Sequence, residues 1–220
     1  MPPQTNYIET LYPQIKFNIS DPHSVLRQNK VTEKDIVNLC GGIPLANITK
    51  IKVDISSQYQ PALCVQIKTD QYETVRTMDF TLKQIDNNIM IVSDEAKGKH
   101  IGTNLFLNQL VTARVHDFEK LHTIAVAPSK YDDEGTAWYG YYFWANLGFQ
   151  NMEPDEYRAW AAEMQREEPT LSELMQTDQG RELWRNTGIS WIGEFFLAQG
   201  HPCYHYLKLH LKRKGIQFDL

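Results

Sequence analysis

The residues best suited to chemistry lie in a glycine-bearing turn that opens a helix in the middle of the chain. The turn reads Lys97-Gly98-Lys99-His100-Ile101-Gly102-Thr103. The first backbone N–H groups of a helix lack intrahelical acceptors and lie at the positive end of the helix dipole, so they can bind an anion such as a pyrophosphate. Lys97 and Lys99 add positive charge at the same place. A tight strand-to-helix connection without a ligand is the alternative interpretation.

Four residues near the C-terminus are of types that bind zinc: His201, Cys203, His205 and His210. We expect residues 204–211 to form a strand, because two sets of side chains alternate there with a period of two. His205 and His210 are five positions apart, so a strand would direct them to opposite faces. The spacing therefore favours a protein without a metal site.

Composition and charge exclude several classes of protein. The chain has 220 residues, enough for one structural domain, and 42% of them are hydrophobic, enough for a substantial core. A net charge of -5 argues against nucleic acid as a partner, since phosphate binding requires a basic face. Three widely separated cysteines form no disulfide framework, which favours a reducing compartment. We find no signal-peptide pattern and no apolar run of membrane length, and expect a cytoplasmic protein without a membrane segment.

The elements that position the turn begin with an N-terminal arm and a helix, residues 1–45. Thr32 is predicted to cap this helix together with Asp35, and Gly41-Gly42 to end it. Four strands follow, separated by turn residues, so neighbouring strands are expected to be antiparallel. The predicted strands are 48–55, 62–69, 73–82 and 88–93, with turns at 58–61, 70–71 and 86–87.

A helix from residue 101 to about residue 118 follows the glycine-bearing turn and leads to a fifth strand at 122–127. Because a helix joins them, the fourth and fifth strands are predicted to be parallel, with a right-handed crossover. After a polar loop, Gly135-Thr136 opens a second helix, which ends at Gly148 in the left-handed conformation. A sixth strand is expected to begin at Phe149-Gln150.

The C-terminal part is predicted to be a helical insertion, residues 153–203, followed by a closing strand and the C-terminus, residues 204–220. Three helix starts are expected within the insertion, at Pro154, Thr170 and Asp178. Residues 189–198 are also expected to be helical. The insertion could act as a lid, as a homodimer face or as packing, and packing or a partner face is favoured over a catalytic role.

Two motifs and the order of the elements resemble the GNAT family of acyl-CoA-dependent N-acyltransferases. The order strand-strand-strand-helix-strand-helix-strand across residues 62–151 is similar to the core of that family. The turn at 97–102 resembles its Arg/Gln-x-x-Gly-x-Gly/Ala pattern. The run Trp144-Ala145-Asn146-Leu147-Gly148-Phe149 resembles its Tyr-x-x-x-Gly-Phe signature. The chain thus looks like a divergent member, with residues 46–152 as an acyl-CoA-binding core.

The resemblance implies an α/β fold with a mixed, mainly antiparallel central sheet flanked by helices, and with the helical insertion before the last strand. It implies that residues 97–103 hold the pyrophosphate of acetyl-CoA or another acyl-CoA. It also implies that the fourth and fifth strands diverge around the pantetheine arm of this cofactor. A primary amine of a small molecule or a peptide would then attack the thioester directly.

The resemblance further assigns roles to ionisable residues, because the attacking amine must be neutral and the leaving thiolate gains from a proton donor. Asp94 and Glu95, which end the fourth strand, are the expected bases. Asp79 lies in the third strand and needs a partner if it is buried, so it either faces the substrate or points outward. The family's tyrosine acid has no counterpart at its own position, so the acid is expected among three nearby tyrosines, of which Tyr142 is our choice and Tyr139 and Tyr141 are the alternatives.

Trp144 occupies the position of the family's frequent tyrosine acid, and an indole is a poor proton donor. This departure favours an alternative function, in which the protein is a catalytically inactive GNAT-like module that binds acyl-CoA or another protein. A third interpretation keeps the fold but assigns a different acyl-group reaction, such as a decarboxylation.

Overall fold

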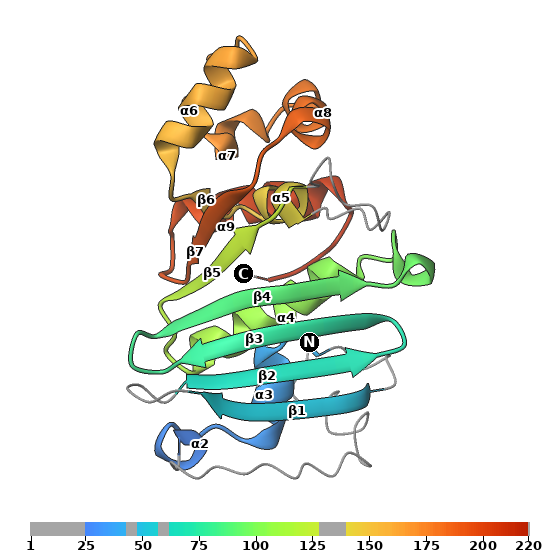
Figure 1. Cartoon of the computed structure of the whole chain (residues 1–220), viewed down its shortest axis with the longest axis vertical. Coiled ribbons are helices and arrows are strands. Elements are labelled where there is room, and N and C mark those ends of the chain that lie inside the picture. Colours follow the sequence, from blue (N-terminus) through green and yellow to red (C-terminus); the bar gives the residue numbers. More distant parts are fainter. Residues whose placement is uncertain (1–24, 43–47, 57–61, 128–139, 220) are drawn as a thin grey trace. The chain divides into compact units, whose positions relative to one another are not determined.

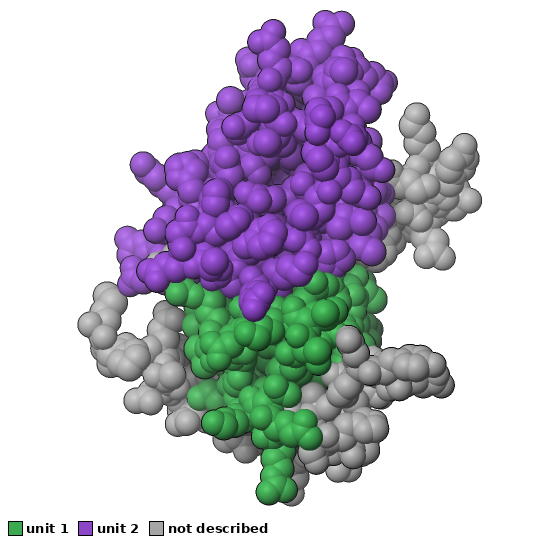
Figure 2. All heavy atoms as spheres, turned by 90° about the vertical axis from the view of Figure 1, so that its left-hand side faces the viewer, with its two compact units in different colours: residues 1–118 green, residues 119–220 purple. Residues whose placement is uncertain are grey.

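The computed structural model describes residues 25–42, 48–56, 62–127 and 140–219. The chain forms two compact units, Met1–Phe118 and Glu119–Leu220, which Figure 2 shows in different colours. The boundary between the units falls inside the segment 46–152, and the organisation as one structural domain stays a prediction. In the described ranges no helix combines the length and the apolar character that a membrane span requires.

The first unit contains a four-stranded antiparallel sheet in the order β1-β2-β3-β4 (Figure 1). Its strands are β1 Ile48–Ser56, β2 Ala62–Thr69, β3 Tyr72–Asp79 and β4 Gln84–Val92. Alternate residues of β2 and β3 are buried, as the two-residue period of their sequences predicts. The four predicted strands and their antiparallel pairing are therefore confirmed.

Helices α3 Glu33–Leu39 and α4 Ile101–Val115 cover one face of this sheet (Figure 1). The unit also contains the helix α2 Val25–Gln28 and the 3-10 helix η1 Asp94–Ala96. Thr32 and Asp35 form the predicted capping box at the start of α3. At its end Gly41 has a φ of 83°, and Asn108 of α4 donates a hydrogen bond to the carbonyl oxygen of Gly42 at 2.7 Å. The end of α3 is thus tied to α4.

The turn between β3 and β4 lies at residues 80–83, earlier in the chain than predicted. We expected a turn at Asp86-Asn87, which is wrong because these residues lie inside β4. The carboxylate of Asp79 accepts hydrogen bonds from the backbone N–H groups of Thr81 and Leu82, at 2.9 and 2.8 Å. These bonds stabilise the earlier turn.

A β-bulge interrupts the pairing of β3 with β4. Val75 pairs with Ile89 and Arg76 with Asn87, so Asn88 is an extra residue in β4. The bulge changes which β4 residues face the helices and explains why its sequence lacks regular alternation. Arg76 is 2% exposed, and its Nη1 donates hydrogen bonds to the carbonyl oxygens of Val75 and Ile89. Burial lowers the pKa of Arg76 to about 10.

The second unit contains a three-stranded antiparallel sheet in the order β5-β7-β6. Its strands are β5 Lys120–Ala125, β6 Gln150–Asn151 and β7 Trp191–Phe196. Its helices are α5 Gly140–Asn146, α6 Pro154–Glu163, α7 Leu171–Leu174, α8 Asp178–Thr187 and α9 Pro202–Arg213.

The predicted fifth and sixth strands are confirmed, and Gly148 has the expected left-handed conformation, with φ 91°. The predicted start of the second helix, Gly135-Thr136, lies outside the described residues. The parallel alignment of the fourth and fifth strands concerns both units and stays a prediction.

The prediction of a helix over residues 189–198 is wrong, because Trp191–Phe196 is the strand β7. This strand lies between β5 and β6 and pairs with both. Trp191, Gly193 and Phe195 are buried on one face of the strand, and Glu194 is buried on the other. On the other face the carboxylate of Glu194 lies 2.5 Å from the ammonium group of Lys120 on β5. Pairing with distant strands therefore decides the conformation of this apolar run.

The prediction of a closing strand over residues 204–211 is also wrong, because they belong to the helix α9. The buried residues of α9 recur at intervals of three or four: Cys203, Tyr204, Leu207, His210 and Leu211. Pro202 is the first helical residue after the N-cap His201, a helix start that proline favours. The last strand of the sheet is therefore β7, and a helix follows it.

Helices α6, α7 and α8 lie between β6 and β7, so the predicted helical insertion is present but the strand after it is β7. The rings of Trp160 and Trp184 pack edge to face at 4.6 Å, and Trp184 is fully buried. Nε1 of Trp160 donates a hydrogen bond to the carbonyl oxygen of Thr187 at 2.9 Å. These contacts give the insertion its own aromatic core. The lid and homodimer roles stay predictions.

Candidate functional site

The glycine-bearing turn follows the end of β4 in the first unit. After η1, Gly98 has a φ of 79°, and His100 is left-handed, with φ 60° and ψ 17°, at the N-cap of α4. A Cβ added at Gly98 would meet no atom within 4 Å, so glycine serves the backbone conformation there rather than close packing. Ala96 is buried and holds the turn to the unit, whereas residues 97–100 are exposed.

The first turn of α4 presents open backbone donors. Asn104 N–H donates to the carbonyl oxygen of His100 at 3.0 Å, which is the first bond of the helix. The preceding N–H groups, of Ile101, Gly102 and Thr103, have no acceptor in the described part of the chain. The N-caps of α3, α7, α8 and α9 each supply a side-chain acceptor, whereas His100 supplies none. The positive end of this 15-residue helix can therefore hold an oxyanion.

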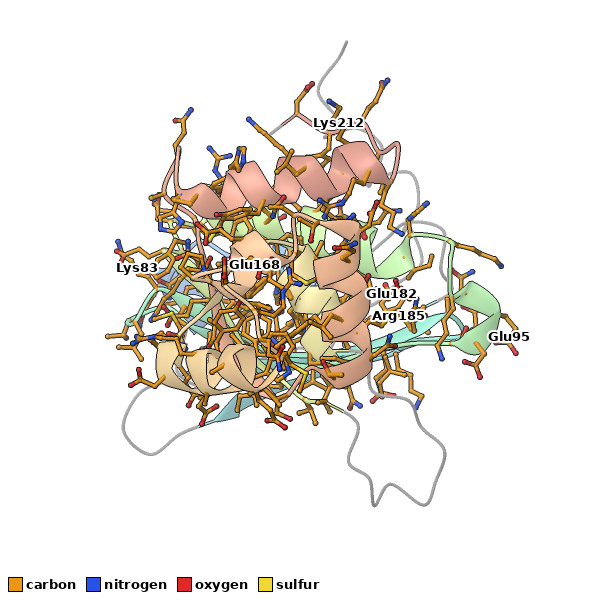
Figure 3. All side chains as sticks on the ribbon, turned by 90° about the horizontal axis from the view of Figure 1, so that it is seen from above. Lys83, Glu95, Glu168, Glu182, Arg185 and Lys212 are labelled. Carbon is orange, nitrogen blue, oxygen red and sulfur yellow. The ribbon has the colours of Figure 1, made fainter. Side chains whose placement is uncertain are left out.

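Charged residues precede these donors in the sequence. Nζ of Lys97 lies 2.5 Å from Oδ1 of Asp94. Lys97, which is predicted to bind the pyrophosphate, thus forms an ion pair with Asp94, which is a predicted base. Because the side chains of Lys97 and Asp94 are 52% and 86% exposed, a competing anion can displace this pair at little cost. Lys99 and His100 are exposed beside the donors. Figure 3 shows Glu95 projecting away from the ribbon at the same end of the sheet.

Asp79 lies far from this turn. It pairs with Gln84 at the start of β4, whereas the turn follows Val92 at the end of β4. The nine residues of β4 span about 26 Å. In Figure 3, Lys83, in the β3–β4 turn, and Glu95 lie at opposite sides of the view. The structure therefore places the other two predicted bases next to the turn but not Asp79, whose carboxylate caps the β3–β4 turn.

The tyrosines predicted as acids have different surroundings in α5 of the second unit. Tyr141 is buried, its hydroxyl donates to the carbonyl oxygen of Arg185, and its own carbonyl oxygen accepts hydrogen bonds from two tryptophan indoles. Its role is therefore structural. Tyr142 is half-buried, with the guanidinium carbon of Arg185 5.8 Å from its ring centre. Tyr139 lies outside the described residues.

Trp144, at the position of the family's tyrosine, belongs to the core of the second unit. It is 5% exposed, and its ring centre lies 5.0 Å from those of Phe143 and Phe149. Phe149 packs in turn on Phe195 of β7, at 5.6 Å. The signature residues Trp144 and Phe149 thus build the core.

A cysteine–histidine pair at the start of α9 was not predicted. Nδ1 of His201 lies 3.2 Å from Sγ of Cys203 and accepts a hydrogen bond from its backbone N–H at 3.4 Å. Such pairs activate thiol nucleophiles that are accessible. Here Cys203 is fully buried, and burial raises the pKa of its thiol to about 12, so the thiol stays neutral and His201 serves as a helix cap. Among the residues with described positions, no three His, Cys, Asp or Glu side chains could hold a metal ion.

The second unit is expected to lose stability as the pH falls below neutrality, because His201 becomes protonated. Burial lowers the pKa of His201 below its usual 6.5, so the unfolded chain takes up the proton first. The contribution is present above about pH 6.5 and is lost as the pH falls through the lowered pKa. A protonated Nδ1 cannot accept the hydrogen bond of Cys203, and losing a cap costs about 1 kcal/mol.

Urea unfolding followed by tryptophan fluorescence measures this loss, because all five tryptophans belong to the second unit. His201→Asn keeps a capping oxygen that does not titrate, so the variant should lose less stability than the wild type as the pH is lowered from about 7.5, by at most about 1 kcal/mol. An equal loss in both proteins would contradict this role of His201.

Comparison with known proteins assigns no family. No family model matches the chain, and no curated protein matches it. The GNAT interpretation therefore depends on the turn, on the signature and on the order of the elements described above.

Proposed function

We propose that the protein is an acyl-CoA-dependent N-acyltransferase of the GNAT type. Acetyl-CoA is the simplest donor, and the acceptor is a primary amine of a small molecule or a peptide. The observation that carries the proposal is the row of open N–H donors at Ile101, Gly102 and Thr103, positioned by the left-handed Gly98 and His100. The order of the elements from β2 to β6 also agrees with the order that the resemblance implies.

In the proposed reaction the amine nitrogen attacks the thioester carbonyl carbon, the carbon–sulfur bond breaks, and an amide and a free thiol form. The amine must give up a proton, which Asp94 or Glu95 accepts directly or through a water molecule. Binding of the pyrophosphate would compete with Asp94 for the ammonium group of Lys97. Tyr142 stays the predicted proton donor to the thiolate.

Calorimetry with coenzyme A and acetyl-CoA tests the proposal. Both compounds should bind, because both carry the pyrophosphate. Acetyl-pantetheine, which lacks the nucleotide and the pyrophosphate, should bind at least about 100-fold more weakly, since the helix terminus recognises the anion. If neither coenzyme A nor acetyl-CoA binds, the proposal is wrong.

Removing the carboxylate next to the turn is expected to slow acyl transfer. Release of thiol from acetyl-CoA, measured with a panel of primary amines, should fall about 100-fold in Asp94→Asn or in Glu95→Gln, whichever group is the base. Asp79→Asn is the matched control, because it changes the same charge at the far end of β4 and keeps an oxygen for the turn. A similar loss in the Asp79 variant would show that the effect is one of charge or folding.

A catalytically inactive acyl-CoA-binding module is the second candidate. It is favoured by the burial of Trp144 in an aromatic cluster where the family has a tyrosine acid. For this candidate, calorimetry would show binding of coenzyme A, whereas no amine of the panel would cause release of thiol.

A further inference from the structure

A pocket of about 400 Å³ lies at the C-terminal end of α4, within the first unit. Three turns that are distant in sequence form it, with Asn29 and Lys30 after α2, Phe80 and Lys83 between β3 and β4, and residues 115–118 after α4. Its volume is in the range of small-molecule sites, about 300–1,000 Å³. The 15 residues of α4 span about 22 Å, so the pocket is separate from the turn at the other end of this helix.

Three charged residues that line the pocket have a left-handed backbone. Their φ angles are 54° at Lys30, 49° at Lys83 and 56° at Asp117. Within the described ranges, His100 and Gln165 are the other non-glycine residues with positive φ. Side chains are disfavoured in this conformation, so each of these residues is strained relative to glycine.

Elsewhere the chain uses glycine for the same purpose. Lys30 and Asp117 follow the ends of α2 and α4, and Gly41 and Gly148 occupy the corresponding positions after α3 and α5, with φ of 83° and 91°. Each of the three turns that meet in this pocket thus contains a charged residue with a strained backbone. Backbone strain of this kind concentrates at ligand sites, where the side chain has a task that glycine cannot perform.

The pocket combines aromatic walls with a positive net charge. The rings of Phe80 and Phe118 lie 5.1 Å apart and offer a surface for a flat apolar group. Lys30 and Lys83 contribute two positive charges and Asp117 one negative charge. These charges suit a ligand with one negative charge, because the carboxylate of Asp117 would repel further negative charge.

We propose that this pocket binds a small aromatic carboxylate. The ring packs on Phe80 and Phe118, and the carboxylate accepts charge-assisted hydrogen bonds from the ammonium groups of Lys30 and Lys83. The site is independent of the proposed acyl-CoA site, since it lies at the opposite end of α4.

Titration of the isotope-labelled protein with 2-naphthoate, followed by two-dimensional NMR, tests the proposal. The backbone amides of Lys30, Lys83 and Phe118 should shift. The neutral 2-naphthamide, which has the same shape, should bind about tenfold more weakly, because it lacks the charge. Equal affinity for the two compounds, or shifts confined to other parts of the protein, would overturn the proposal.

Glycine variants separate ligand binding from folding. Lys30→Gly and Lys83→Gly should each weaken naphthoate binding about tenfold, whereas the midpoint of thermal unfolding should stay the same or rise by about 2 °C as the strain is relieved. Gln165→Gly relieves the same strain in the second unit and is the matched control, with unchanged binding. Unchanged binding in both lysine variants would overturn the proposal. A lowered midpoint in both would also overturn it, because the lysines would then serve the fold.

Discussion

Replacing Gly102 with aspartate is expected to weaken the binding of coenzyme A about 100-fold while raising the stability of the protein. Gly102 lies in the first turn of α4, where no acidic residue is present. An aspartate there would face the bound pyrophosphate, and repulsion between charges about 4 Å apart near a surface is worth several kcal/mol. The same carboxylate interacts favourably with the helix dipole, and aspartate is a better helix residue than glycine, so the free energy of unfolding should rise by about 1 kcal/mol.

Gly102→Asn is the control for this prediction, because asparagine has the shape of aspartate without its charge. It should reduce the affinity for coenzyme A much less than Gly102→Asp does. Calorimetry measures the affinity, and differential scanning calorimetry measures the stability. If Gly102→Asp binds coenzyme A as tightly as the wild type, the pyrophosphate is not held by this helix terminus.

The first unit and its turn could be predicted because their signals are local. The capping box of α3 is complete within the four residues from Thr32 to Asp35. The alternation in β2 is visible within eight residues, and short turns require antiparallel neighbours. The open donors at residues 101–103 follow from the start of a helix after a glycine, whatever the rest of the chain does.

The second unit was predicted less accurately than the first, because its strands pair with segments that are far apart in the sequence. Ile192 of β7 pairs with Ile124 of β5, and the helices α6 to α8 lie between them in the sequence. A short and mainly apolar run such as β7 fits a strand or a buried helix equally well, and the segments that pair with it decide between them. For α9 the local signal was present: Pro202 at the first helical position outweighs the apparent alternation that follows it.

In the candidate site, too, the sequence predicts the positions of neighbouring residues but not those that depend on the fold. The sequence places Asp94, Glu95 and the turn together because they are contiguous, and the structure agrees. Asp79 seemed equivalent to them, but its position depends on where the turn between β3 and β4 lies, and a carboxylate that caps this turn is at the wrong end of β4. The pocket at the end of α4 has no sequence motif, since its three turns meet only in the folded unit.

Gly148 has a structural task that its motif does not reveal. The residue follows α5 and is left-handed, with φ 91°, as the helix end predicts. In addition, a Cβ at this position would lie 2.6 Å from the carbonyl oxygen of Cys203 and 3.1 Å from the backbone nitrogen of Leu207. These are backbone atoms of α9, which cannot move aside as a flexible side chain would. Glycine is therefore required for α9 to pack against the end of α5.

Gly148→Ala is expected to destabilise the second unit by roughly 2–5 kcal/mol, the sum of the left-handed strain and of overpacking against α9. Gly200→Ala is the matched control: Gly200 has a φ of 81°, but an added Cβ would meet nothing within 4 Å, so the cost should be about 1 kcal/mol. Urea unfolding followed by tryptophan fluorescence reports on this unit. Equal losses in both variants would mean that α9 does not approach Gly148.

A large loss of stability in Gly148→Ala would also show that the signature at residues 144–149 and the turn at residues 97–103 have different roles. The glycine of Leu147-Gly148-Phe149 would be explained by close packing of two helices, and Phe149 by the aromatic core of the second unit. Packing alone does not explain Gly98, where an added Cβ would meet no neighbour, nor the uncapped donors that follow it. The functional proposal therefore depends on the turn at residues 97–103, whereas the signature at residues 144–149 supports the fold.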